Sequence, residues 1–133
     1  MKRLAALLAA ASLVACAGRQ EGNIVSEPGG STSEGEIPAD CPLVIAFGSY
    51  AMGIDSETLR RVEGLLAGDP AVTGVTRSPW GREGEVTLCA AVRSNADRDR
   101  LFAAVAALFP QRPRGPLSVR TNDGREFQAN NGT

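Results

Sequence analysis

The segment 48–53 is the part of this sequence whose residue types come closest to a binding loop. It reads Gly-Ser-Tyr-Ala-Met-Gly and lies between a strand-like and a helix-like segment. Two glycines and a following helix N-terminus could surround an anion with backbone amides, beside the hydroxyls of Ser49 and Tyr50. Arg77 or Arg82 would then contact the anion. Because the loop has no lysine and no phosphate-loop glycine spacing, a plain connecting loop is the competing interpretation.

The sequence offers little else for catalysis. Histidine, the commonest general base and metal ligand, is absent from all 133 residues. The carboxylates considered as possible catalytic acids are Asp55, Glu57, Glu63, Asp97 and Asp99. They lie at expected helix starts or on polar helix faces, where capping and solvation account for them. We therefore expect no catalytic residue, no metal site, no cofactor and no enzymatic activity.

The segment around Trp80 has the composition of a protein-contact surface. It follows Pro79 in an expected hairpin loop, with Arg77, Arg82 and Arg93 nearby in the sequence. An exposed tryptophan among arginines is typical of binding hot spots. The alternative is that Trp80 folds back and covers a small core.

The N-terminus has the pattern of an export signal. Lys2 and Arg3 precede the uncharged run 4–15, which is too short to span a membrane as a helix. The run closes on Leu13, Val14, Ala15 and Cys16. This ending resembles the lipobox of bacterial lipoproteins, in which an aliphatic residue, a tolerant position and a small residue precede the cysteine. The resemblance covers residues 1–16 only, and a plain signal peptide with an incidental Cys16 is the alternative.

The resemblance implies a location. Residues 1–15 would be removed and Cys16 would carry several acyl chains, which hold a protein stably to a membrane. Ala17 stands where Asp would favour retention in the inner membrane of Gram-negative bacteria, so the outer membrane facing the periplasm is expected. The partners would be the membrane and another envelope protein. No basic stripe indicates nucleic acid, and a homo-oligomer stays open.

Composition divides the rest of the chain. Residues 16–40, rich in Gly, Ser and Glu, are expected to be a flexible tether that cannot bury a core. Residues 41–129 form one small domain, and residues 130–133 a disordered tail. With Cys16 assigned to lipid, Cys41 and Cys89 remain to form a disulfide in an exported protein. A metal site or a redox pair is disfavoured, since the chain has neither histidine nor a Cys-x-x-Cys motif.

Periodicity and turn residues predict the elements of the domain. The expected strands cover residues 42–47, 72–77, 85–93, 117–121 and 125–129. The strand 72–77 is expected to have a bulge at Gly74. One helix is expected from the cap Asp55 to Gly68, and a second from the cap Ser94 to Pro110. The order β-α-β-β-α-β, with a short extra C-terminal strand, predicts an α+β fold of the ferredoxin-like, split βαβ type. In this topology the first and third strands are neighbours, which agrees with a bond between Cys41 and Cys89.

The phase of Cys41 leaves one question open. Cys41 alternates in step with Leu43, Ile45 and Phe47, whereas Cys89 points away from the expected helices. Either Cys41 precedes the regular strand pairing, or the open sheet face carries the three apolar residues. The second option would create a patch for a partner or a second copy.

Two functions follow from these observations. The first is a lipid-anchored, non-catalytic interaction module that contacts an envelope protein through Trp80 or the patch Leu43, Ile45 and Phe47. The second is a small-ligand-binding or enzymatic domain that uses the loop 48–53. A pocket joining that loop to an arginine would favour the second function, and a flat apolar sheet face would favour the first.

Overall fold

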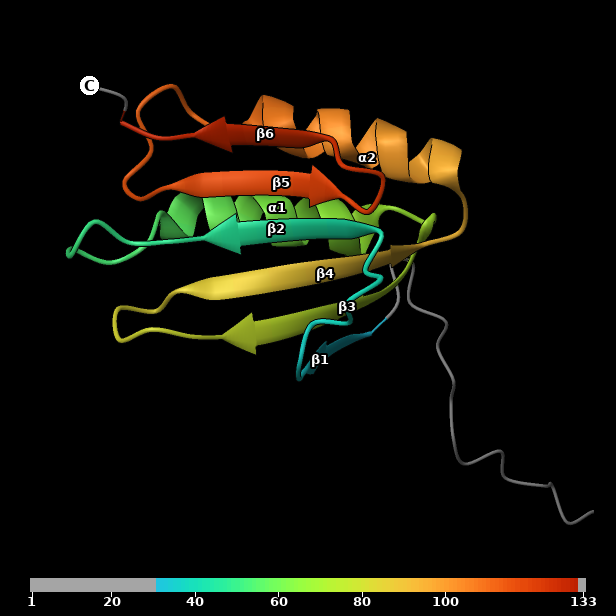
Figure 1. Ribbon diagram of the computed structural model, residues 1–133, viewed down its shortest axis with the longest axis horizontal. Helices are drawn as coiled ribbons and strands as arrows, with labels where there is room; N and C mark the ends of the chain where they lie inside the picture. The colour runs from blue at the N-terminus through green and yellow to red at the C-terminus, as the bar shows by residue number, and fades with distance from the viewer. Residues whose placement is uncertain (1–30, 132–133) are drawn as a thin grey trace, which may run out of the picture.

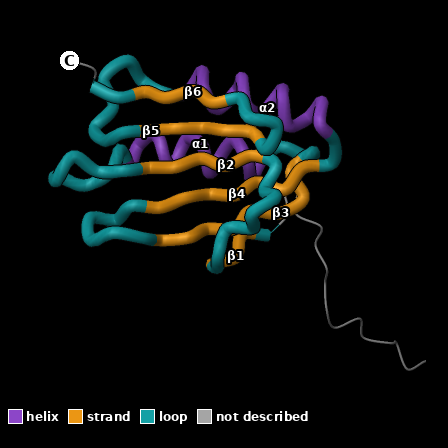
Figure 2. The backbone as a smooth tube through the Cα atoms, in the orientation of Figure 1, coloured by secondary structure: helices purple, strands orange, loops and turns teal. Residues whose placement is uncertain are grey.

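The computed structural model describes residues 31–131, which form an α+β domain (Figure 1). The elements are β1 (Thr32–Glu34), β2 (Leu43–Phe47), α1 (Ser56–Gly68), β3 (Val72–Pro79), β4 (Val86–Val92), α2 (Asn95–Leu108), β5 (Leu117–Thr121) and β6 (Glu126–Ala129). The strands form one mixed sheet in the order β1-β3-β4-β2-β5-β6. The pair β1 and β3 is parallel and every other pair is antiparallel. Both helices cover the same face of the sheet (Figure 2).

Local signals in the sequence set the helix boundaries. The Asp55 carboxylate accepts a hydrogen bond from the Thr58 amide at 3.0 Å and caps α1. The Ser94 hydroxyl accepts one from the Asp97 amide at 3.1 Å and caps α2. Each cap satisfies an amide that the first helical turn leaves without a partner. Both predicted caps are confirmed.

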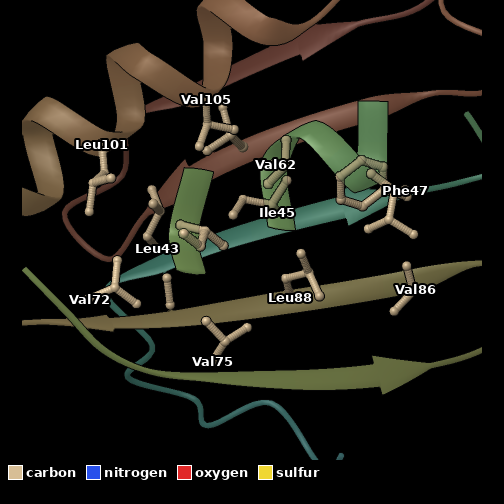
Figure 3. Close-up of a cluster of buried hydrophobic side chains, with 14 of the residues drawn as sticks. Leu43, Ile45, Phe47, Val62, Val72, Val75, Val86, Leu88, Leu101 and Val105 are labelled. Carbon is tan, nitrogen blue, oxygen red and sulfur yellow. The ribbon is translucent and has the colours of Figure 1, made fainter. Parts of the chain in front are cut away.

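The core lies between the helices and the sheet, and Leu43, Ile45 and Phe47 are part of it. All three side chains are 0% exposed and point from β2 toward the helices (Figure 3). The prediction that they form a partner surface on the open sheet face is therefore wrong. Burial of three large apolar side chains favours the helix-covered face, where Val62 and Val105 contact the same cluster.

The disulfide lies on the opposite face of the sheet. As predicted, Cys41 and Cys89 form a disulfide. Their Cα atoms lie 6.0 Å apart, which is an ordinary distance for such a bond. Cys41 precedes β2, so its side chain does not point to the same face of the sheet as that of Leu43. The alternative in which Cys41 precedes the regular strand pairing is therefore correct. Cys41 and Cys89 pack with Val44, and Ile37 covers this second, smaller cluster.

Backbone hydrogen bonds hold one segment near each end of the described residues. Thr32–Glu34 pairs with Val75, Thr76 and Arg77 as strand β1, and the Gly35 amide donates to the Arg77 carbonyl at 3.0 Å. This pairing satisfies backbone groups that β3 would otherwise expose at the sheet edge. At the other end of the chain, the Asn131 amide donates to the Tyr50 hydroxyl at 3.0 Å.

The predicted signal segment, Cys16 and the first part of the tether lie outside the described residues. Among residues 31–131, no helix is long and apolar enough to cross a bilayer. The disulfide fits a protein that resides outside the cytoplasm.

Candidate functional site

Three loops meet at one end of the sheet because of the strand register. Phe47, the last residue of β2, pairs with Val86 and Leu117, which begin β4 and β5. The loop 48–53 after β2, the hairpin loop 80–85 before β4 and the segment 109–116 before β5 therefore lie at the same end (Figure 1). The sequence predicted the three loops but did not predict that they meet.

The carboxylate of Glu83, from the hairpin loop 80–85, contacts the loop 48–53, which was predicted to bind an anion. Its carboxylate accepts hydrogen bonds from the Ser49 hydroxyl and, at 3.3 Å, from the Gly53 amide. The Ser49 hydroxyl also accepts the Ala51 amide at 3.0 Å. The Ser49 bond, followed by the Gly53 bond, lowers the pKa of Glu83. A carboxylate of the protein itself thus fills the position predicted for an external anion at Ser49.

Trp80 folds back onto the sheet, although not onto the main core. Its indole Nε1 donates to the Thr87 hydroxyl at 3.1 Å, and the side chain stays 49% exposed. A shallow depression of about 390 Å³ beside it is lined by Arg77 and Arg82, the two predicted anion contacts. Arg93 follows the far end of β4 and so lies at the opposite end of the sheet.

Asp55 connects α1 to the loop before β5. One carboxylate oxygen caps α1, and the other accepts the Arg114 amide at 3.2 Å. Burial by itself would raise the pKa of Asp55, but the bonds from Thr58 and Arg114 outweigh it and lower the pKa. On the same loop, the Pro116 carbonyl accepts the Gly48 amide at 2.9 Å. These bonds fix the segment 110–116 against both α1 and β2.

A depression of about 440 Å³ opens between the start of α1 and the segment 110–116. Its charged lining is Asp55, Glu57, Arg60, Arg61, Arg112 and Arg114. Arg61 pairs with Glu57 at 2.5 Å, and Asp55 is used by the backbone bonds described above. Within residues 31–131, Arg60, Arg112 and Arg114 form no ion pair, so the depression carries surplus positive charge.

A second depression of about 890 Å³ adjoins the first and shares Arg112 and Arg114 with it. Tyr50 and Met52 line it and are 45% and 90% exposed. Pro113, between the two arginines, is buried, so the loop is anchored while its charged neighbours face solvent. We call the two depressions together the arginine groove, defined by Tyr50, Met52, Arg60, Arg112 and Arg114.

The structure thus divides the predicted site residues. Tyr50 joins the arginine groove, Ser49 serves the link to Glu83, and Trp80 lies on a separate surface. Sequence reasoning treated residues 111–116 as a connecting link and did not assign Arg112 or Arg114 a role. The usable signal was two arginines flanking one proline, which can hold charges outward from a buried anchor.

The chain has no match among protein-family models, curated proteins or solved structures. Among residues 31–131, no three His, Cys, Asp or Glu side chains lie close enough together to hold a metal ion. The geometry of the arginine groove is therefore the main guide to function.

Proposed function

We propose that this protein is a lipid-anchored envelope protein and a non-catalytic protein-interaction module that contacts its partner through the arginine groove. One observation carries the proposal. The exposed side chains of Tyr50 and Met52 share a concave surface with Arg112 and Arg114, neither of which is ion-paired among residues 31–131. Tyrosine, methionine and arginine are enriched at the centres of protein interfaces.

The use of the acidic groups supports a non-catalytic role. Asp55 caps α1, Asp69 binds Arg100 at 2.7 Å, and Glu83 joins two loops. The Asp69 carboxyl has a lowered pKa, chiefly because Arg100 donates to it. Carboxylates held ionised by structural bonds are poor proton donors near neutral pH.

The N-terminal sequence supports the anchor. Residues 1–15 have the charge, apolar length and small residues of a lipoprotein signal, and Cys16 has the position of the acylated residue. With Ala17 after it, the mature chain would be held at the outer membrane, facing the periplasm. A disulfide between Cys41 and Cys89 suits that oxidising compartment.

We also propose that the four inner strands and two helices form a ferredoxin-like, split βαβ unit. The order β3-β4-β2-β5 with antiparallel pairing supports this assignment, as does the position of each helix between two strands in sequence. In this view β1 and β6 are additions at the two sheet edges.

The anchor is tested by mass spectrometry of the mature N-terminus. The expected result is a chain that begins at Cys16 and carries the mass of several acyl chains. The variant Cys16→Ser should leave the membrane fraction. An unmodified Cys16, or cleavage at another site, would overturn the anchor.

The interaction surface is tested by site-specific photo-crosslinking in cells of the native host. A photoreactive amino acid at position 52, in the arginine groove, should give a discrete protein adduct. The matched control is position 128, since Gln128 is exposed on β6 and does not line the groove. Equal labelling at the two positions, or no adduct at position 52, would contradict the proposal.

The alternative function, a small-ligand or enzymatic domain at the loop 48–53, has weaker support. Glu83 already uses the Ser49 hydroxyl and the Gly53 amide, so an anion would have to displace a carboxylate. The depression next to Tyr50 does join this loop to arginines, but these are Arg112 and Arg114 rather than Arg77 or Arg82.

A further inference from the structure

We infer that the arginine groove accepts an extended, acidic protein segment, with carboxylates against Arg112 and Arg114 and an apolar side chain against Tyr50 and Met52. The inference rests on the proposed function and adds the chemistry of the partner to it. It depends on three features of the described residues: the charge of the groove, its apolar half and its rigidity.

The charge of the groove suits carboxylates. Four arginines and two carboxylates line the depression at α1, and the two carboxylates are engaged within the protein. The guanidinium group is a planar fork that pairs with a carboxylate through two parallel hydrogen bonds. Arg112 and Arg114 lie two positions apart on one loop, so successive acidic residues of an extended chain could reach both.

The helix adds to this positive potential. The depression contains the first turn of α1, including Ser56 and Glu57, where the helix dipole has its positive end. The dipole and the arginines favour the same sign of ligand. The helix is an addition to the arginine cluster here, and it would not define a site without that cluster.

The apolar half of the groove distinguishes a protein segment from other anions. A small inorganic anion held by the arginines would leave Met52, which is 90% exposed, and Tyr50 uncovered. A lipid bilayer presents a flat surface, whereas the arginine groove is formed by two adjoining depressions of about 440 and 890 Å³. A chain that combines acidic and apolar side chains can fill both halves.

The groove is held in place before a ligand arrives. Asp55 binds the Arg114 amide, Pro113 is buried, and Gly48 donates to the Pro116 carbonyl. The Tyr50 hydroxyl is also fixed by the Asn131 amide. Such preorganisation lowers the entropy cost of binding, which matters for a segment that must itself become ordered.

The experiment compares synthetic peptides by fluorescence anisotropy with the disulfide-bonded protein. The first probe is a short peptide in which Glu alternates with Leu, and its control replaces every Glu by Gln. The double variant Arg112→Gln with Arg114→Gln removes the central charges. The matched control, Arg93→Gln with Arg120→Gln, removes two exposed arginines outside the groove.

We expect the acidic peptide to bind about tenfold more tightly than its amide control, and the groove variant to abolish this difference. The control variant should change the affinity less than about twofold, and added salt should weaken binding. The variant Met52→Ser should weaken binding of the acidic peptide without removing its preference over the amide control.

Several outcomes would overturn the inference. One is equal affinity for the acidic peptide and its amide control. Another is an equal loss of affinity for the acidic peptide in the groove variant and the control variant. A third is no binding of the acidic peptide. Two competitors are added in separate experiments: inorganic phosphate, and vesicles made of phosphatidylglycerol. If either displaces the acidic peptide through the same arginines while showing no dependence on Met52, the surface recognises anions in general and the peptide assignment fails. A discrete adduct at position 52 without acidic selectivity would reject this inference and leave the proposed function standing.

Discussion

The Asp55 carboxylate accepts the backbone amide of Arg114 at 3.2 Å, although 59 positions separate the two residues. The same carboxylate caps α1 through the Thr58 amide. One acidic side chain therefore sets both the start of the helix and the position of the loop that carries Arg112 and Arg114. The cap was expected from the sequence, whereas the link to the loop exists only in the folded protein.

Two substitutions at Asp55 should separate its two roles. Asp55→Ala removes both bonds and should lower the free energy of unfolding by about 2 kcal/mol. Asp55→Asn keeps an oxygen for the Thr58 amide but loses an acceptor for Arg114, so we expect a loss of about 1 kcal/mol. Urea unfolding followed by circular dichroism measures both values. Equal losses in the two variants would mean that the link to Arg114 contributes nothing.

The contribution of Asp55 should disappear in acid. Its pKa is lowered below the ordinary value of 3.8 in the folded protein, so the folded state binds its proton less readily than the unfolded state. The resulting stabilisation is fully present above about pH 5 and is lost as the pH falls through the folded-state pKa. The stability gap between the wild type and Asp55→Asn should therefore shrink below pH 3.8. A gap that grows on acidification would contradict the assigned direction.

The link between the loops 48–53 and 80–85 should depend on Glu83. In Glu83→Gln the amide is a weaker acceptor for Ser49 and Gly53, so the Gly53 amide should exchange its hydrogen faster with solvent. Amide exchange monitored by NMR measures this rate. Val62 in the core provides the internal control and should keep its protection. Unchanged exchange at Gly53 would show that Glu83 does not hold the loop.

Loss of the disulfide should destabilise the domain substantially. The bond closes a loop between residues 48 positions apart, which corresponds to roughly 4 kcal/mol in the chain-entropy model. Cys41→Ala with Cys89→Ala should lower the denaturant midpoint accordingly, and dithiothreitol should affect the wild type but not this variant. A midpoint that dithiothreitol leaves unchanged in the wild type would argue against the bond.

Two glycine substitutions should have opposite effects. A Cβ atom at Gly115 would lie 2.0 Å from the Gly48 carbonyl oxygen, so Gly115→Ala must shift the backbone beside the arginine groove. We expect a loss of about 1–3 kcal/mol. Gly64 lies in α1 with nothing within 4 Å of its Cβ position, so Gly64→Ala should stabilise the protein by about 0.5–1 kcal/mol. Thermal unfolding of both variants measures the contrast, and destabilisation by Gly64→Ala would contradict it.

Local chemistry made most elements predictable. The caps Asp55 and Ser94 act on amides only three residues away, so the sequence contains the whole interaction. The irregularity near Gly74 appears as a shift of register between Val72 and Gly74, as the break in apolar alternation predicted. The disulfide was predictable because the lipobox resemblance left only Cys41 and Cys89 to pair.

Position in space was not predictable from the same signals. Cys41 and Leu43 have the same phase in sequence but lie on opposite faces, because Cys41 comes before regular pairing begins. Strand β1 has no apolar alternation of its own and forms through backbone bonds to β3, which carry little sequence signature. The first reason explains why the predicted partner patch was wrong. The second explains why the sequence analysis did not predict strand β1.

The helices, most strands and the cysteine pair follow from the sequence, because these features depend on residues close together or on composition. The export signal stays a prediction from the sequence. The candidate site, in contrast, depends on tertiary contacts. The strand register placed three loops at one end of the sheet, Glu83 filled the expected anion loop, and Asp55 fixed Arg114 beside Tyr50 and Met52. Contacts between distant segments depend on how the whole chain packs, and no short window of residues contains that information.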